Sequence, residues 1–343
     1  MVFRRVGDVS VLEVESFVAG EPGPGELAID VAFAGVNYAD VLARRGFYKW
    51  APAPPTCVGF EISGTVAAVG PGVTSFSRGD RVLAITRFGG YASRVNVEAA
   101  RAFAVPAEMT LEHAAAIPAV YLTAWHSLCE IARVRAGESL LIQAVAGGVG
   151  LAALQLGKHL GLVTYGTASS AEKLAFAREH GLDHAIDYAR SDFEVEIARL
   201  TGGRGVDVVL DSLGGEGLKK GYRALACCGR LVTIGAAQVA PTSRRDPLAW
   251  MRAGVELWRG GVFHPFQLIE DNKSIAGVQV LLLWDDLPRV RRGLDAVLAL
   301  STQGTIRPHV DRIYPLSRAA EAHLRLETRA SKGKLLLDCR SDG

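Results

Sequence analysis

Between two apolar runs lies the glycine-rich stretch Ala144-Val145-Ala146-Gly147-Gly148-Val149-Gly150. Residues 138–143 before it have the composition of a buried strand, and residues 151–160 after it have that of a helix. Glycines let a backbone turn sharply and approach a pyrophosphate, which then binds the free N–H groups and the positive dipole end of the helix. The stretch therefore predicts a dinucleotide-binding turn in which Gly147, Gly148, Val149 and Gly150 hold the pyrophosphate.

Strand-like and helix-like segments alternate along the chain after about residue 122. Such alternation predicts an α/β domain with a parallel, doubly wound Rossmann sheet. The expected strand and helix pairs are 139–143 with 149–160, 162–166 with 171–180, 184–188 with 191–200 and 206–211 with 214–225, followed by strands 230–235 and 273–280.

The first 120 or so residues are instead rich in strands, because apolar and polar residues alternate along 26–31 and 64–70. The tail returns to a mixed pattern that we expect to complete this first domain. Its expected elements are a helix at 285–300, a strand at 309–314, a helix at 317–328 and a strand at 333–338. We therefore expect a catalytic domain of residues 1–121 and 284–343 and a cofactor-binding domain of residues 122–283.

The end of the second expected strand indicates which dinucleotide is bound. An NAD enzyme usually has an acidic side chain there, which bonds the ribose 2′-hydroxyl. This chain has hydroxyls, ending in Ser169 and Ser170, and Lys173 follows one helical turn later. Hydroxyls and an ammonium suit a 2′-phosphate, so we expect NADPH rather than NADH. The two serines also fit a simple helix cap.

Length and charge exclude several other classes of protein. A chain of 343 residues suggests two domains, and a net charge of +2 gives no reason to expect nucleic acid as a partner. No apolar leader follows Met1, and the most hydropathic window, 139–162, is broken by glycines and polar residues, so no membrane span is expected. The 5 cysteines form no framework and are typical of reduced thiols in the cytoplasm. The adjacent pair Cys227 and Cys228 is expected to be buried at a strand edge rather than to form a metal site.

Several ordered blocks resemble the medium-chain dehydrogenase/reductase family, in its zinc-lacking branch of quinone oxidoreductases, enoyl reductases and VAT-1-like proteins. The blocks are Gly35-Val36-Asn37-Tyr38-Ala39-Asp40, Gly59-Phe60-Glu61-Ile62-Ser63-Gly64, Gly79-Asp80-Arg81-Val82, Leu122-Thr123-Ala124-Trp125 and Gly333-Lys334, together with the glycine-rich stretch. The resemblance covers nearly the whole chain and implies a GroES-like fold for the catalytic domain. It does not determine the substrate.

Two departures from the zinc-dependent relatives indicate that zinc is absent. Asn37 stands roughly where their first cysteine ligand is, and Phe60 replaces the histidine before Glu61. Neither an amide nor a phenyl ring gives zinc an adequate site. Without a Lewis acid, the chemistry that fits best is hydride delivery from NADPH to an acceptor that is already electrophilic. We expect an α,β-unsaturated acyl thioester, such as a short or branched enoyl-CoA, or an enone; the alternative is a quinone.

The resemblance also implies roles for individual residues. Asn37, Asp40 and Tyr48 match residues that line the family's catalytic cleft, although Asn37 and Asp40 also fit a capped turn and Tyr48 fits a core position. Further cofactor contacts are implied for Thr123, Tyr188 and Gly235. Glu61 is expected to remain as a structural residue that bonds backbone N–H groups.

The stretch 236–272 is the least family-like part of the chain. Its Arg244, Arg245, Arg252 and Arg259 alternate with aromatic residues, which would suit the phosphates and adenine of a CoA substrate. An amphipathic surface helix with solvated arginines is the other interpretation. The expected strand at 273–280 resembles one that pairs across a two-fold axis, which implies a homodimer. A cofactor-binding protein without turnover also stays possible.

Overall fold

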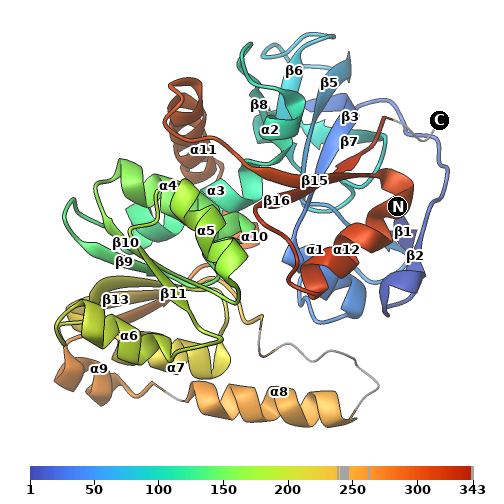
Figure 1. Cartoon of the computed structure of the whole chain (residues 1–343). Coiled ribbons are helices and arrows are strands. Elements are labelled where there is room, and N and C mark those ends of the chain that lie inside the picture. The colour runs from blue at the N-terminus through green and yellow to red at the C-terminus, as the bar shows by residue number, and fades with distance from the viewer. Residues whose placement is uncertain (238, 240–246, 262, 341–343) are drawn as a thin grey trace. The chain divides into compact units, whose positions relative to one another are not determined.

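The structure of the chain is a computed structural model that describes residues 1–237, 239, 247–261 and 263–340 (Figure 1). The chain divides into two compact units. The first consists of Met1–Leu122 together with Val280–Gly343, and the second of Thr123–Gln279. Within the described residues, no helix is both long and apolar enough to cross a membrane.

The second unit is built on a six-stranded sheet in which every neighbouring pair of strands is parallel. Its strands are β9 (Ser139–Ile142), β10 (Val163–Ala168), β11 (His184–Asp187), β12 (Val206–Asp211), β13 (Leu225–Thr233) and β14 (Ser274–Gly277). Their spatial order is β11-β10-β9-β12-β13-β14. This is the strand order of a dinucleotide-binding fold, so the predicted doubly wound parallel sheet is confirmed.

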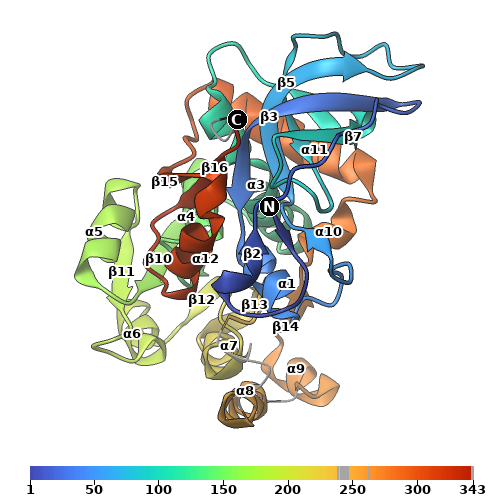
Figure 2. The same cartoon turned by 90° about the vertical axis from the view of Figure 1, so that its right-hand side faces the viewer.

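The helices of this unit connect successive strands. They are α4 (Gly148–His159), α5 (Ala171–Glu179), α6 (Phe193–Leu200), α7 (Gly215–Arg223), α8 (Pro247–Gly260) and α9 (Pro265–Asp271), and a π-helical turn, η3 (His126–Ile131), comes before them. Both views show α8 beside α7 (Figures 1 and 2). The central strand β9 is buried along its whole length, as expected for a parallel strand covered on both faces.

Three features of this unit differ from the sequence prediction. Strand β13 begins at Leu225 rather than at 230, because Leu225 pairs with Val206 before the register shifts and Arg230 pairs with Val208. The last strand is only Ser274–Gly277, since Val280 already begins helix α10. The cysteines at 227 and 228 are exposed rather than buried, because they lie in the segment that this register shift loops out.

The first unit holds a seven-stranded sheet of order β15-β16-β3-β5-β6-β8, with β7 also paired to β3. Its strands are β3 (Glu26–Val36), β5 (Glu61–Val69), β6 (Arg81–Ile85), β7 (Arg94–Glu98), β8 (Ala102–Ala104), β15 (Val310–Pro315) and β16 (Lys334–Asp338). A small second sheet contains β1 (Val2–Phe3), β2 (Leu12–Glu13) and β4 (Thr56–Cys57). Figure 2 shows the long strand β3 between β5 and β7, with both of which it pairs.

The helices of the first unit come from both ends of the chain. They are α1 (Tyr38–Arg45), α2 (Leu111–Ala115), α10 (Val280–Leu283), α11 (Leu287–Thr302) and α12 (Ala319–Glu327), with short 3-10 turns η1 (Val9–Val11), η2 (Ala99–Arg101) and η4 (Leu316–Arg318). Helix α3 (Pro118–Trp125) includes the boundary between the units. The tail joins the first sheet directly, because β16 pairs antiparallel with β3, with Leu335 opposite Val36.

Candidate cofactor and acceptor sites

The glycine-rich turn joins the end of β9 to the start of α4. Ala144 has a left-handed φ of 51°, and Gly147 is the N-cap residue of the helix. A Cβ on Gly150 would lie 2.4 Å from the Ala144 carbonyl oxygen and 2.8 Å from Val145 Cα, so only glycine lets the helix approach the turn this closely. The N–H groups of the first helical turn have no carbonyl partner within the helix. The turn therefore fits a pyrophosphate.

The residues expected at the 2′-phosphate lie at two adjoining strand ends. Ser170 is the N-cap of α5 and accepts a hydrogen bond from the Lys173 backbone N–H at 3.3 Å. The Tyr188 N–H donates to the carbonyl of Ala168, the last residue of β10, at 3.2 Å. Glu172 is exposed. The structure thus brings Ser170, Lys173 and Tyr188 to the carboxyl ends of β10 and β11, which are neighbours in the sheet.

A buried carboxyl group organises the next strand ends. Asp211, the last residue of β12, is fully buried and accepts hydrogen bonds from the N–H groups of Leu213 and Gly214 and from the Thr233 hydroxyl at 2.9 Å. Burial raises the pKa of this carboxyl above its ordinary value. Gly235 follows β13 and is exposed. Sequence reasoning had not singled out Asp211, although a carboxyl group that ends a buried strand is a recognisable signal.

Thr123, the last of the expected cofactor contacts, lies within α3. It is 7% exposed, and its carbonyl accepts a hydrogen bond from the Ser127 hydroxyl at 2.7 Å. The Thr123 carbonyl is therefore bonded within the helix, and the expected contact of Thr123 with the cofactor stays a prediction.

A buried ionic cluster surrounds Asn37 in the first unit. The Lys334 ammonium lies 2.5 Å from Glu61 Oε1 and donates to Asn37 Oδ1 at 2.6 Å. Asn37 Nδ2 donates to Glu61 Oε1 at 2.8 Å, and the Ala119 N–H donates to Glu61 Oε2 at 2.6 Å. Asn37 is half-buried, whereas Glu61 is completely buried and Lys334 is 3% exposed. Glu61 therefore bonds a backbone N–H as expected, and Lys334 is a member of the cluster that sequence reasoning missed.

Asp40 is completely buried, and donors occupy both of its carboxyl oxygens. Oδ1 accepts from the Gly59 N–H at 2.9 Å, and Oδ2 accepts from the Asn37 N–H at 2.8 Å and from the Tyr91 hydroxyl at 3.1 Å. Burial raises the pKa of Asp40 to about 7, while these donors and the charge of Lys334 lower it. This geometry fits a residue that fixes the turn after β3, and we propose positioning rather than contact with substrate as its role.

The Asp40 network continues through two further buried side chains. The Tyr91 hydroxyl lies 3.3 Å from His323 Nε2, and His323 Nδ1 lies 3.4 Å from Arg44 Nη1. Because the Tyr91 hydroxyl donates to Asp40, its oxygen is left to accept from Nε2–H, and Nδ1 then accepts from Arg44. Burial and the charge of Arg44 lower the pKa of His323 to about 3. Arg44 also forms an ion pair with Glu327.

Tyr48 belongs to an aromatic cluster centred on Phe60. The Tyr48 ring packs edge-on against Trp50 at 5.4 Å and against Phe60 at 5.8 Å between ring centroids. Phe60 in turn packs against Phe88 at 5.1 Å and Trp284 at 5.7 Å. The Trp284 indole nitrogen is buried without a hydrogen-bond partner. The residue that replaces a zinc-binding histidine in the resemblance therefore lies among aromatic rings.

The described residues do not bring together three or more histidine, cysteine, aspartate or glutamate side chains in a way that could hold a metal ion. The absence of zinc, which Asn37 and Phe60 predict, stays a prediction that metal analysis must test.

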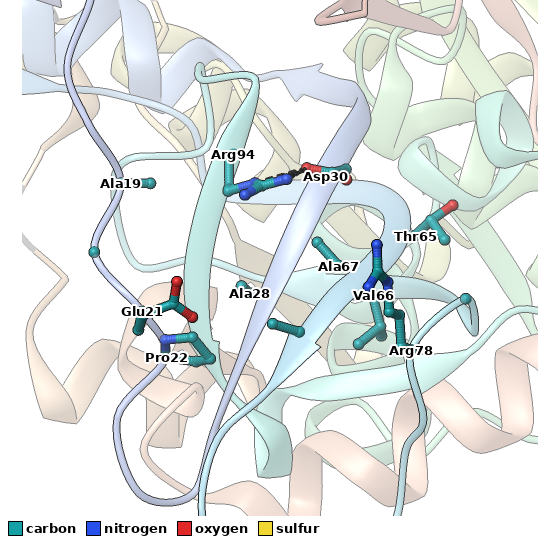
Figure 3. A pocket seen from close by; sticks show the side chains of 13 residues that line it. Ala19, Glu21, Pro22, Ala28, Asp30, Thr65, Val66, Ala67, Arg78 and Arg94 are labelled. Atoms are coloured by element: carbon teal, nitrogen blue, oxygen red, sulfur yellow. Dashed lines mark hydrogen bonds and ion pairs between the residues drawn. The ribbon is translucent and has the colours of Figure 1, made fainter.

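A hollow of about 360 Å³ in the first unit lies apart from Asn37 (Figure 3). It is lined by Ala28 and Asp30 of β3, Arg94 of β7 and Arg78, and Asp30 forms an ion pair with Arg94, which lies opposite it on the paired strand. Asp30 and Asn37 are seven residues apart along an extended strand, which corresponds to roughly 23 Å. We do not assign this hollow to the site around Asn37.

The arginines of the stretch 236–272 have separate surroundings. Arg252 is exposed on α8, and Arg259 forms ion pairs with Glu256 and Glu216. Arg244 and Arg245 lie outside the described residues. The two arginines on α8 agree with a solvated helix face.

Comparisons with known proteins match most of the chain. The family described as zinc-binding dehydrogenase matches residues 180–337, and the alcohol dehydrogenase GroES-like domain matches residues 23–107. The rat synaptic vesicle membrane protein VAT-1 homolog is 36% identical over 326 residues, which cover 95% of this chain and 80% of that protein. The chain belongs to the medium-chain dehydrogenase/reductase family, in its zinc-lacking branch.

Solved structures of this family have the same fold. The Escherichia coli quinone oxidoreductase complexed with NADPH has a TM-score of 0.86 at 28% identity, covering 98% of each chain. The CurK enoyl reductase has a TM-score of 0.81 at 26% identity, also covering 98% of each chain. Medium-chain dehydrogenase/reductase proteins with different acceptors thus share this architecture, and the acceptor has to be argued from the site.

Proposed function

We propose that this protein is an NADPH-dependent reductase that reduces the activated C=C bond of an α,β-unsaturated acyl thioester or enone without zinc. The observation that carries the proposal is the pairing of an oriented amide, Asn37, with an aromatic cluster in place of a metal site. The NADPH complex of the quinone oxidoreductase supports the same class of cofactor for this chain.

The cofactor-binding roles follow from the second unit. The first-turn N–H groups of α4 bind the pyrophosphate, and Gly150 keeps the helix close to the turn. Ser170, Lys173 and Tyr188 bind the 2′-phosphate through two hydroxyls and an ammonium. When bound, NADPH supplies the hydride.

Residues of the first unit bind the acceptor. Besides its bond to Glu61, Asn37 Nδ2 makes only a long contact of 3.5 Å with the Gly35 carbonyl among the hydrogen bonds within the described residues. We assign the second N–H of Nδ2 to the acceptor carbonyl, whose oxygen gains negative charge as the double bond is reduced. Tyr48 and Phe60 form an apolar wall that excludes water, and the Tyr48 hydroxyl is our candidate for delivering the proton to the α-carbon.

A quinone is the second candidate acceptor. The clustering of Tyr48, Trp50, Phe60, Phe88 and Trp284 favours it, because flat conjugated rings stack well on aromatic side chains. Quinone reduction also makes less demand on a placed proton donor. The likeness to the VAT-1 homolog keeps a third possibility open, in which the protein binds NADPH without turnover.

One experiment separates these functions. Purified protein is mixed with NADPH, and the loss of NADPH absorbance is followed with crotonyl-CoA, 3-methylcrotonyl-CoA, an enone and a naphthoquinone. Turnover of an acyl-CoA or the enone, with little on the quinone, supports the proposal. Turnover of the quinone alone refutes it in favour of the second candidate. Tight NADPH binding without turnover of any acceptor favours the binding protein.

A further inference from the structure

Strand β13 carries two adjacent thiols on a looped-out segment. Only Asp207 separates Val206 from Val208 on β12, yet four residues, 226–229, separate their partners Leu225 and Arg230 on β13. Cys228 has a left-handed φ of 63°, and its N–H donates to the Asn272 carbonyl at 2.8 Å. Cys227 and Cys228 are both exposed, which makes them accessible to a solute.

The two thiols are held together by their surroundings. Their sulfur atoms lie 3.9 Å apart. Asn272 Nδ2 donates to Cys228 Sγ at 3.1 Å and to Cys227 Sγ at 3.5 Å, and hydrogen bonds of this kind favour thiolates. The Lys273 ammonium interacts electrostatically with Cys227. The hydrogen bond between the two thiols and then the charge of Cys227 raise the pKa of Cys228.

The sulfur separation suits a shared metal ion better than a disulfide. Two sulfur atoms 3.9 Å apart, each bonded to one ion at about 2.3 Å, subtend about 116° at that ion, without movement of either side chain. A disulfide would require the sulfur atoms to approach to about 2.05 Å. It would also join Cα atoms about 3.8 Å apart, below the usual disulfide range, and would be strained.

We propose that Cys227 and Cys228 form a surface site for a soft, thiophilic d10 cation, and that the ion is Cu(I). Thiolates select soft ions, and the angle of about 116° suits a three-coordinate Cu(I), to which a ligand from solution supplies the third bond, whereas Zn(II) requires four ligands. Two thiols bind one Cu(I) and release two protons, with no change in oxidation state. Asn272 acts as a positioning residue because it bonds both sulfur atoms.

This site is independent of the proposed reductase function. The cofactor-binding residues lie at the carboxyl ends of the parallel strands, where Thr233 bonds Asp211. The cysteines precede Arg230, the residue at which β13 resumes its pairing with β12, and so lie toward the amino ends. Copper binding is therefore expected to leave NADPH binding unchanged.

The test is an anaerobic titration of the reduced full-length chain against Cu(I) held by bicinchoninate, followed by the absorbance of the copper chelate. The wild-type chain is expected to withdraw one Cu(I), which Cys227→Ser and Cys228→Ser each abolish. Cys129→Ser is the matched control, since that thiol lies elsewhere in the same unit, and it is expected to behave like the wild type. Asn272→Ala is expected to keep the stoichiometry but to weaken binding by about 10-fold.

Two results would overturn the proposal. One is a wild-type chain that leaves all Cu(I) with bicinchoninate, and the other is equal withdrawal by the wild type and both serine variants. Circular dichroism and NADPH affinity are measured on every variant. Unchanged values show that a loss of copper binding does not come from a loss of fold.

Discussion

Replacing Asp40 by asparagine is expected to change how the stability of the protein depends on pH. Asp40 and His323 are both completely buried, and the Tyr91 hydroxyl joins them. The pKa of Asp40 is raised from 3.8 to about 7, and the pKa of His323 is lowered from 6.5 to about 3. Burial is the largest cause of both shifts, and it acts in opposite directions because it favours the neutral form of each group.

In the wild-type chain, the effects of the two pKa shifts on the pH dependence of stability cancel. Between pH 3.8 and 6.5 the folded state holds a proton on Asp40 and none on His323, whereas the unfolded state holds the reverse. The numbers of bound protons are then equal, so this pair adds no slope to the free energy of unfolding against pH. In Asp40→Asn only His323 titrates, and the unfolded state binds one proton more. Stability then rises with pH by about 1.4 kcal/mol per unit, or at most about 4 kcal/mol over the window.

The measurement is urea unfolding of both proteins at intervals from pH 4 to pH 7. The two proteins are compared by the slope of unfolding free energy against pH. The free energies themselves differ at every pH, because the substitution also removes hydrogen bonds to Asp40. His323→Gln is the matched control, and it leaves only Asp40 to titrate. Its stability is expected to fall as pH rises from 3.8 to about 7. Equal slopes in the wild type and Asp40→Asn would refute the assigned protonation states.

Three further predictions concern the two candidate sites. Lys173→Ala is expected to raise the Kd for NADPH by about 10- to 100-fold, because one charge-assisted hydrogen bond is lost, and to leave the Kd for NADH unchanged. Equal changes in the two Kd values would remove the assignment of Lys173 to the 2′-phosphate. Gly150→Ala is expected to weaken NADPH binding and lower Tm, because its Cβ would lie 2.4 Å from a backbone oxygen. Gly147→Ala, whose Cβ would lie 3.3 Å from the same oxygen, is expected to have a smaller effect. Fluorescence titration with NADPH and thermal unfolding of both variants test this order. Lys334→Met is expected to lower the free energy of unfolding by about 3–5 kcal/mol, because it leaves Glu61 charged and buried. The double variant Lys334→Met with Glu61→Gln is expected to recover part of this loss. If urea unfolding shows no recovery, the ion pair is contradicted.

The parts of the fold that follow from local pattern could be predicted from the sequence. Alternation of strands and helices predicted the parallel sheet, and the glycine-rich stretch predicted the turn into α4. Asn37 and Asp40 are three residues apart, so the capped turn that they form was visible as an alternative. The looped-out segment of β13 was not, because a register shift depends on how the neighbouring strand pairs.

The long-range contacts could not be predicted in the same way. Lys334 reaches Asn37 only because β16 pairs with β3, at a separation of 297 residues. The one local signal was a lysine directly before an apolar strand, which needs a buried partner of opposite charge. His323 gave no such signal, since a histidine on an amphipathic helix is as often exposed as buried.

The ionic cluster fixes the orientation of the Asn37 amide, and this limits the chemistry of the site. An ammonium can only donate and a carboxylate can only accept, so the atom facing Lys334 is Oδ1 and the atom facing Glu61 is Nδ2. One N–H of Nδ2 donates to Glu61, and the other, which meets the Gly35 carbonyl only at 3.5 Å, is the N–H that we propose for the acceptor. A single neutral donor stabilises a carbonyl oxygen that gains partial charge far better than it stabilises a full alkoxide. The arrangement therefore favours acceptors whose negative charge is spread over a conjugated system, which enones, enoyl thioesters and quinones share and simple aldehydes and ketones lack.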